Sequence, residues 1–178
     1  YANGRALDTS LVSGAREAAA RVQSLVPGSA AAMLVRAYVS RHVEHQYDSA
    51  RGYLERGTRL APSDFRFGAN LALLQYQNLG EADESLRHFE RARALDPRNA
   101  SLAELHARAL IAAGRVDEAR VAADRALALS PMISPGVATR VRVELTAGDT
   151  VAARLLLAQL APGMTGGRPL LELAVLAG

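Results

Sequence analysis

Residues 100–133 read ASLAELHARALIAAGRVDEARVAADRALALSPMI, and this stretch decides the fold. Its landmarks are a glycine near the middle and a proline near the end. The triplet Leu-x-Pro recurs along the chain at spacings of 35, 35, 34 and 31 residues, and a mid-repeat marker recurs at 35, 34 and 34. A period near 34 residues with these landmarks predicts stacked helical hairpins. The prolines are Pro27, Pro62, Pro97, Pro131 and Pro162, and the markers are His45, Gly80, Gly114 and Gly148.

Regular columns of small and apolar residues accompany these markers. Residues five positions after a marker are small, those twelve positions after it are small in three repeats, and the residue nine positions after it is mostly apolar. These offsets place the columns on one helical face, where small side chains let neighbouring helices approach closely. The first predicted helix of each hairpin has a similar column ten residues after the proline. The fifth-position column is Ala50, Ser85, Ala119 and Ala153, and the ninth-position column is Leu54, Phe89, Ala123 and Leu157. The twelfth-position column is Gly57, Ala92 and Ala126, and the column of the first helix is Ala37, Ala72, Ala107 and Val141.

The glycine markers predict tight turns between paired helices, because glycine adopts positive φ without a Cβ clash. Asn99 is expected to cap the helix that follows Pro97. His45 takes the place of the first glycine, which leaves the geometry of that turn open. The repeats that end at Pro62 and Pro97 each contain one extra residue, which we expect in the turn inside the hairpin.

These features resemble the tetratricopeptide repeat. The match is best over residues 100–133, through Ala107, Gly114, the run Asp117-Glu118-Ala119, Ala126-Leu127 and Pro131, and it is nearly as good over residues 65–99. The tryptophan that is common early in this family's repeat is absent. The resemblance implies an all-α, right-handed superhelical solenoid of antiparallel helix pairs, with a concave groove that binds peptides or protein segments.

We expect residues 1–178 to form a single solenoid of this kind. A partial repeat is predicted over 10–29, full repeats over 30–64, 65–99, 100–133 and 134–162, and a terminal helix over 168–177. Neither end is convincingly polar, although terminal repeats normally need a polar outer face. The apolar segments 7–12 and 169–176 are therefore expected to pack on a neighbouring copy or on a missing part of a larger protein.

The composition restricts the classes of function and partner. There is no cysteine, so thiolate metal sites and disulfides are excluded, and no apolar run reaches the ~18 residues of a membrane span. The net charge of +3 and the scarcity of aromatic residues do not favour a nucleic-acid partner. All 21 basic residues are arginine, which is typical of a GC-rich, bacterial genome. No residue pattern specifies a compartment, and the cytoplasm is the default.

No constellation of catalytic or cofactor-binding residues emerges. His42, Glu44 and His45 are the densest group of metal-ligand types, but a zinc site needs three or four ligands and no further histidine or cysteine lies nearby in sequence. The acidic pairs recur at the starts of predicted helices, where the helix dipole favours negative charge. We therefore predict no enzyme activity, no cofactor and no metal.

The resemblance places the binding surface on the first helix of each pair. Arginine and amide side chains there can bind extended peptide backbone and acidic side chains. The alternative is that they form only the solvated face of amphipathic helices. The family's Lys/Asn/Arg carboxylate clamp does not map onto this lysine-free chain. The candidates are Arg36, Arg41, His42, Asn70, Leu74, Gln77, Asn78, Glu104, Arg108, Ile111, Arg142 and Thr146.

We predict a non-catalytic scaffold that binds a protein or peptide segment. Arg36, Arg108 and Arg142 suggest a preference for acidic segments. The alternative is a segment for self-association, through the terminal helices, or for regulation within a larger multidomain bacterial protein such as a kinase, a transcription regulator or a secretion component.

The turn assignment predicts the effect of one substitution. Gly114→Val should lower the free energy of unfolding by more than ~1 kcal/mol, because valine cannot adopt the positive φ that the turn requires without strain. Thermal unfolding followed by circular dichroism measures the change. An unchanged midpoint would show that the turn does not lie at Gly114.

Overall fold

The computed structural model describes residues 9–131 and 134–158, and all regular structure within these ranges is helical. None of the described helices is long and apolar enough to cross a membrane. The helices are α1 (Thr9–Leu25), α2 (Ala30–His42), α3 (Tyr47–Leu60), α4 (Phe65–Leu74), the π-helical turn η1 (Gln75–Leu79), α5 (Ala82–Leu95), α6 (Ala100–Ala112), α7 (Val116–Leu129), α8 (Ser134–Thr146) and α9 (Thr150–Ala158).

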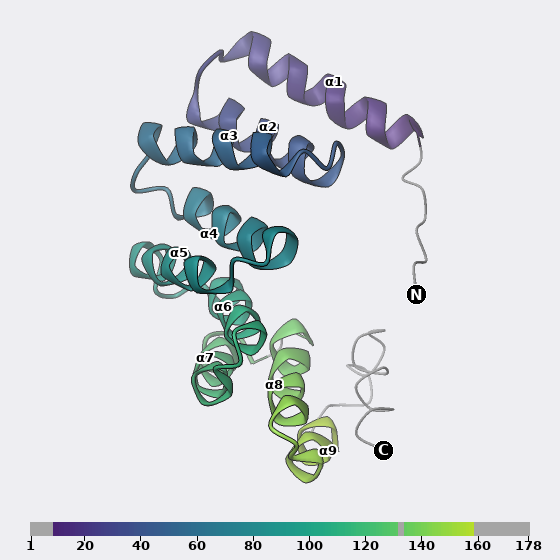
Figure 1. Ribbon diagram of the computed structural model, residues 1–178, viewed down its shortest axis with the longest axis vertical. Helices are drawn as coiled ribbons and strands as arrows, with labels where there is room; N and C mark the ends of the chain where they lie inside the picture. Colours follow the sequence, from purple (N-terminus) through teal and green to yellow (C-terminus); the bar gives the residue numbers. More distant parts are fainter. Residues whose placement is uncertain (1–8, 132–133, 159–178) are drawn as a thin grey trace. The chain divides into compact units, whose positions relative to one another are not determined.

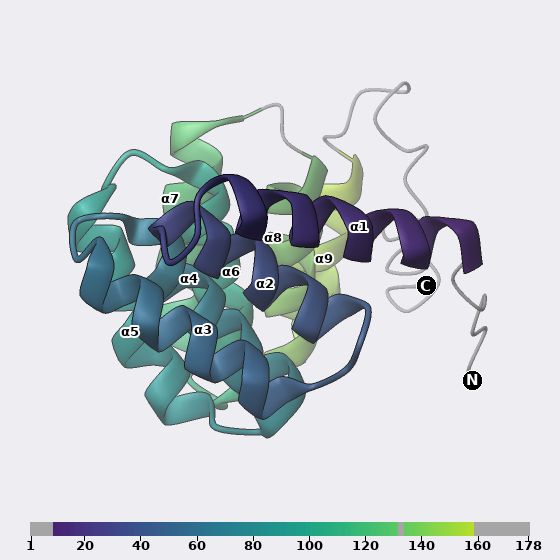
Figure 2. The ribbon, with the colours of Figure 1, turned by 90° about the horizontal axis from the view of Figure 1, so that it is seen from above.

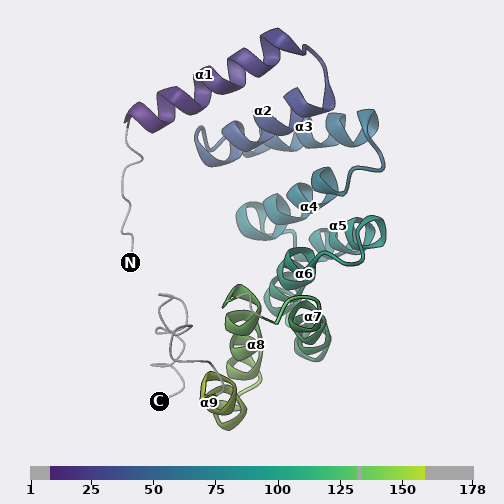
Figure 3. The same ribbon diagram turned by 180° about the vertical axis from the view of Figure 1, so that it is seen from behind.

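The chain divides into two compact units between Leu79 and Gly80. In unit 1, α1 packs on α2, α2 on α3 and α3 on α4, in the order of the sequence (Figures 1 and 3). Figure 2 shows α2 and α3 running side by side as a hairpin. In unit 2, α5 packs on α6, α6 and α7 pack on each other and on α8, and α8 packs on α9. The expected terminal helix over 168–177 lies outside the described residues.

The predicted columns of small residues form the contacts between helices. The fifth-position column, Ala50, Ser85, Ala119 and Ala153, is fully buried in all four repeats. Ala72 and Ala107 are also fully buried. Gly57 shows why a small residue is required, since a Cβ built there would lie 2.0 Å from a ring carbon of Phe67 on α4. Larger residues such as Phe67 and Leu54 then fill the space between the helices of unit 1.

The hairpin turns adopt the predicted left-handed conformation. Gly114 and Gly148 have φ of 73° and 79°. His45 has φ of 55°, so the first turn keeps the same local conformation without a glycine. Nothing lies within 4 Å of a Cβ built on Gly114, so a side chain there would cost backbone strain rather than a clash. The Asn99 side chain accepts a hydrogen bond from the Leu102 backbone N–H at 3.0 Å, as the capping prediction requires.

The extra residues of the two longer repeats are accommodated in different ways. In the first hairpin, the Gln46 N–H donates to the Ser40 carbonyl. The equivalent bond of the third hairpin, from the Arg115 N–H to the Leu110 carbonyl, spans one residue fewer. The extra residue of the first hairpin lies at the turn, as expected. In the second case the last helical turn before Gly80 widens into η1. This difference arises because one additional residue fits either into a loop or into a π-helical turn.

Unit 2 contains a carboxylate that is buried and fully paired. Glu144 on α8 is 3 % exposed and accepts hydrogen bonds from Arg120 Nε at 3.0 Å and Arg120 Nη2 at 2.9 Å. Arg140, one helical turn earlier on α8, also donates to Glu144 and pairs with Asp124 of α7. These contacts join α7 to α8 through a charge network centred on the buried carboxylate of Glu144.

Removing this carboxylate should strongly destabilise unit 2. Glu144→Ala removes the charged hydrogen bonds to both arginines, and the expected loss is about 2 kcal/mol in the free energy of unfolding, because Arg120 keeps Asp117 and Arg140 keeps Asp124 as a partner. The matched control is Glu118→Ala, which removes an exposed carboxylate paired with Arg115 and should leave the unfolding midpoint nearly unchanged. Chemical denaturation of both variants measures the difference, and similar midpoints would contradict the role of Glu144.

Candidate functional site

The structure brings together four of the predicted site residues of unit 1, namely Arg41, His42, Gln77 and Asn78. Arg41 lies near the end of α2 and is 5 % exposed. Its Nε donates to Asn78 Oδ1 at 2.9 Å, and its Nη2 donates to the Leu73 carbonyl at 3.1 Å and to Gln77 Oε1. Burial lowers the pKa of the Arg41 guanidinium, although Tyr76 and Tyr47 act in the opposite direction.

The widened turn η1 supplies the acceptors for Arg41. Gln77 and Asn78 both lie in η1, and their side chains are exposed on the surface of the unit. Gln77 Nε2 also donates to the Tyr76 hydroxyl at 2.7 Å, so the amide is oriented by hydrogen bonds on both sides. A single inserted residue therefore creates the local geometry that binds the Arg41 guanidinium, in keeping with the frequent occurrence of π-helical turns at functional sites.

An exposed aromatic pair lies beside Arg41. His42 is exposed and its ring centroid lies 4.5 Å from that of Tyr38, whose residue is 60 % exposed. Burial of part of the ring lowers the pKa of His42, with further lowering from Arg41 and His45. Unit 1 thus offers exposed ring faces, two amides and one edge of a guanidinium, which are groups suited to bind a peptide.

The remaining candidates of unit 1 serve the fold. Leu74 is fully buried in the core of unit 1, so its prediction as a groove residue is wrong; the apolar face of α4 points inward at this position. Asn70 Nδ2 donates to the Arg66 carbonyl of its own helix at 2.8 Å. Arg36 lies 3.8 Å from Glu44 and 5.4 Å from the ring centroid of Tyr53.

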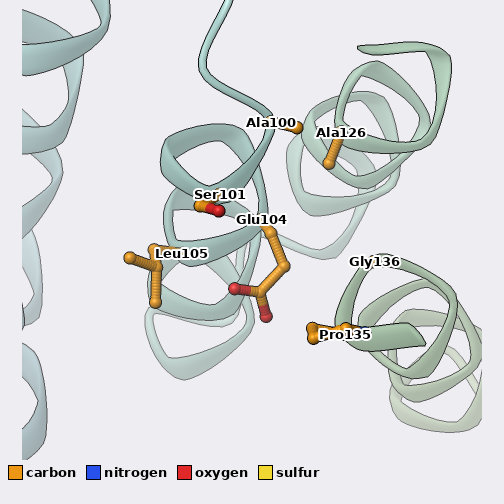
Figure 4. A pocket seen from close by; sticks show the side chains of 7 residues that line it. All are labelled: Ala100, Ser101, Glu104, Leu105, Ala126, Pro135 and Gly136. Carbon is orange, nitrogen blue, oxygen red and sulfur yellow. The ribbon is translucent and has the colours of Figure 1, made fainter. Parts of the chain in front are cut away.

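In unit 2 the candidate Glu104 lies at the wall of a cavity. Glu104 is 8 % exposed, and its Oε1 accepts a hydrogen bond from the Thr139 hydroxyl at 2.7 Å. Arg108 Nη1 lies 3.7 Å from the same oxygen. Figure 4 shows the carboxylate extending from α6 toward the start of α8. The cavity has a volume of about 230 Å³ and is lined by Ala100, Ser101, Glu104, Leu105, Ala126, Pro135 and Gly136.

The other candidates of unit 2 are more dispersed. Arg142 is exposed on α8, and no ion pair forms with it among the described residues. Thr146 is exposed, and its hydroxyl donates to the Arg142 carbonyl at 2.9 Å. Ile111 is half-buried on α6. The sequence reasoning missed Thr139, which no repeated column marks, and it named Glu104 without identifying the cavity.

The sequence reasoning also gave no role to His106. This residue is 6 % exposed on α6, its ring centroid lies 6.0 Å from that of Phe89, and neither ring nitrogen has a hydrogen-bond partner among the described groups. His106 follows Ala103 by three residues and precedes Leu110 by four, so helical periodicity places it on the buried face. It lines a second cavity of about 250 Å³ with Glu90, Arg93, Leu110, Glu118, Val121, Ala122 and Arg125.

No metal centre forms in the described part of the chain, since no three histidine, cysteine, aspartate or glutamate side chains come together there. Glu44, part of the densest group of ligand types in the sequence, instead accepts from the Ser40 hydroxyl at 3.3 Å and lies 3.7 Å from Arg16.

The comparisons with known proteins agree with this fold. Residues 78–132 match the sequence model of the tetratricopeptide repeat. No curated protein sequence matches the chain significantly. The fold is that of a helical-repeat protein, and the match to this repeat supports a scaffold for protein interaction. Over residues 78–132 the chain is therefore similar to the tetratricopeptide repeat family, and the solved structures described next share its fold.

Three solved structures are similar to this chain. PilW, a type IV pilus biogenesis factor, has a TM-score of 0.74 at 17% identity over 92% of this chain and 83% of its own. The first TPR of Spaghetti (RPAP3), bound to the HSP90 peptide SRMEEVD, has a TM-score of 0.63 at 18% identity, and the match covers 67% of this chain and 96% of that one. An O-GlcNAc transferase mutant from Thermobaculum terrenum has a TM-score of 0.65 at 22% identity, and the match covers 72% of this chain and 25% of that one. These likenesses establish an all-α, tetratricopeptide-like helical solenoid.

The buried histidine predicts a pH dependence of stability. Burial, and next the Arg93 guanidinium, lower the pKa of His106 below its ordinary value of 6.5; Glu90 and Glu118 raise it and Arg115 lowers it further. The unfolded chain therefore binds a proton at a higher pH than the folded chain, and this residue's effect is a loss of stability as the pH falls below about 6.5.

His106→Leu tests this expectation. The variant should lose less stability than the parent protein between about pH 7.5 and about pH 5, because it removes the group that protonates on unfolding. Urea denaturation at each pH measures the change, and His106→Gln is a control that keeps a polar side chain without titrating. Parallel pH profiles for all three proteins would refute the assignment.

Proposed function

We propose that the chain is a non-catalytic scaffold that binds a protein segment, and that Arg41 receives an acidic side chain of that segment. The observation that carries this proposal is a buried cation without a counter-ion. Arg41 is 5 % exposed, and no carboxylate lies within ion-pair distance of it among the described residues. Buried charges in proteins are normally paired, because desolvation of an isolated charge costs several kcal/mol.

The neutral partners of Arg41 compensate its charge only in part. Two amide oxygens and one backbone carbonyl accept from Nε and Nη2. The remaining nitrogen, Nη1, makes no hydrogen bond with a described residue, and it is not fully enclosed, so it keeps access to the surface. An incoming carboxylate can therefore accept a charge-assisted hydrogen bond from Nη1 without displacing the existing contacts.

The surroundings of Arg41 supply contacts for an extended chain. The exposed amides of Gln77 and Asn78 can donate to peptide carbonyls, and the exposed ring of Tyr38 offers an apolar surface. The similar Spaghetti domain is bound to a peptide whose sequence, SRMEEVD, contains acidic residues. That complex supports a peptide-binding role for this fold, and the acidic preference rests on Arg41 itself.

The three arginines that suggested an acidic partner in the sequence differ in whether a carboxylate of the chain lies near them. Arg36 lies near Glu44 and Arg108 lies near Glu104, so an external carboxylate would compete with a residue of the chain at both positions. Arg142 is exposed and has no such competitor among the described residues. Arg142 is thus the second position, in unit 2, at which we place an acidic contact.

A second function is favoured by the apolar surface of α1. Leu11 and Leu25 of α1 are exposed, and an interface would cover them. The match covers 25% of the O-GlcNAc transferase chain, so in that protein this fold is one part of a longer chain. Association with a second copy or with another domain is therefore the alternative, and light scattering across a concentration series tests self-association. The expected contact over 169–176 lies outside the described residues.

The proposal predicts a charge-selective loss of binding in an Arg41 variant. Calorimetry with short capped peptides rich in glutamate, glutamine or lysine should show preferential binding of the glutamate peptides, weakened by added salt. Arg41→Gln should weaken binding of the glutamate peptides about tenfold, since one charge-assisted contact is lost. Arg41→Lys, which keeps the charge without the fork of donors, should give an intermediate loss.

The matched control is Arg59→Gln, which removes an exposed arginine of α3 without disturbing the Arg41 contacts. It should bind the glutamate peptides like the parent protein. Thermal unfolding of each variant separates a loss of binding from a loss of folding. Equal affinity for acidic and basic peptides, or equal losses in the Arg41 and Arg59 variants, would refute the proposal.

A further inference from the structure

We propose that the cavity between α6, α7 and α8 is a receptor for one lysine side chain of the bound partner. The inference rests on the proposed protein-binding function, but it concerns another unit and a ligand group of the opposite charge. The cavity joins an apolar wall to a single buried carboxylate, that of Glu104 (Figure 4).

The size and lining of the cavity suit a side chain rather than a small molecule. Its volume of about 230 Å³ lies below the ~300–1,000 Å³ of typical small-molecule sites. Ala100, Leu105, Ala126 and Pro135 contribute apolar atoms to the wall, and Gly136 contributes no side chain. An aliphatic stem that enters this space gains from the removal of its methylene groups from water.

Glu104 retains one unused acceptor. Its Oε1 accepts from the Thr139 hydroxyl at 2.7 Å and faces Arg108 Nη1 at 3.7 Å. Its Oε2 makes no hydrogen bond with a described residue. This oxygen is not fully enclosed by the protein either, so it remains accessible. Figure 4 shows the carboxylate at the edge of the space that Pro135 and Gly136 line. A donor that occupies the cavity can therefore bind Oε2.

The same unit contains a second buried glutamate that serves as an internal comparison. Glu144 accepts from three guanidinium nitrogens of two arginines through both of its oxygens, and this network joins α7 to α8. Glu104 is about as buried, yet it has one hydroxyl and one guanidinium at a longer distance. Its negative charge is therefore less completely compensated within the chain, and the incomplete compensation occurs where a cavity is present.

Lysine fits these features better than arginine. Its compact ammonium can approach a single oxygen, and its four-carbon stem can bury against apolar walls. Arginine binds carboxylates best through two parallel hydrogen bonds, but Oε1 of Glu104 is already engaged by Thr139. An uncharged aliphatic side chain would fill the cavity and leave Oε2 without a donor.

Two small probes test the inference without any peptide. N-acetyl-lysine-N-methylamide and its uncharged analogue N-acetyl-norleucine-N-methylamide have similar stems and differ at the terminal group. Titration of the isotope-labelled full chain, followed by two-dimensional amide NMR, should show the lysine probe shifting Leu105, Ala126 and Gly136. The norleucine probe should bind about tenfold more weakly, because it lacks the charged donor.

Two variants assign the effect to the site. Glu104→Gln keeps the shape and an acceptor for Thr139 but removes the charge, and it should weaken the lysine probe about tenfold. Ala100→Leu should fill the cavity and weaken both probes while Glu104 remains in place. Glu55→Gln, at an exposed position on α3, is the control and should change nothing. Thermal unfolding confirms that each variant is folded.

The outcomes separate this inference from the peptide-binding proposal. Equal binding of the two probes, unchanged lysine binding in Glu104→Gln, or chemical shift changes that lie only outside the cavity would each overturn it. None of these results depends on Arg41 or on an acidic peptide, so the acidic-segment proposal is judged separately by its own variants.

Discussion

Close approach of helix backbones is the constraint on which the rest of the structure depends. The fifth-position column of alanine and serine is fully buried in all four repeats, and Gly57 admits the Phe67 ring where any Cβ would clash. Helices packed this closely leave no room for large side chains at these positions, so the large apolar residues occupy the spaces between columns. The columns fix which face of each helix points inward, and the polar faces remain for binding.

This constraint explains why so much of the fold could be predicted from the sequence. Small residues at fixed offsets, left-handed turn positions and helix caps are local features, and the structure confirms the buried columns, the glycine turns and the Asn99 cap. The spacing also reveals that two repeats contain an extra residue. It cannot locate that residue within the second of them, because a π-helical turn and a longer loop satisfy the same count.

The candidate sites were less predictable, because they depend on contacts between residues distant in sequence. Arg41 and Asn78 were both candidates, yet their hydrogen bond joins α2 to η1 across 37 positions, which no periodic pattern specifies. Leu74 was misplaced because residues 71–74 at the end of α4 are all apolar, so the sequence there does not show which of them faces the core. Thr139 carries no repeat signature, so its hydrogen bond with Glu104 could not be anticipated.

The buried charges of the described residues differ in how completely the chain compensates them. Glu144 is saturated by arginines and acts as part of the fold, whereas Arg41 and Glu104 each keep one accessible atom after their internal contacts are made. A buried charge of this second kind destabilises the isolated chain and gains most from a ligand of opposite sign, because its desolvation has already occurred on folding. Arg41 depends on the widened turn and Glu104 on Thr139, and both are departures from the repeat. Residues that every repeat shares hold the helices together, so under these proposals binding specificity arises at the positions where the repeats differ.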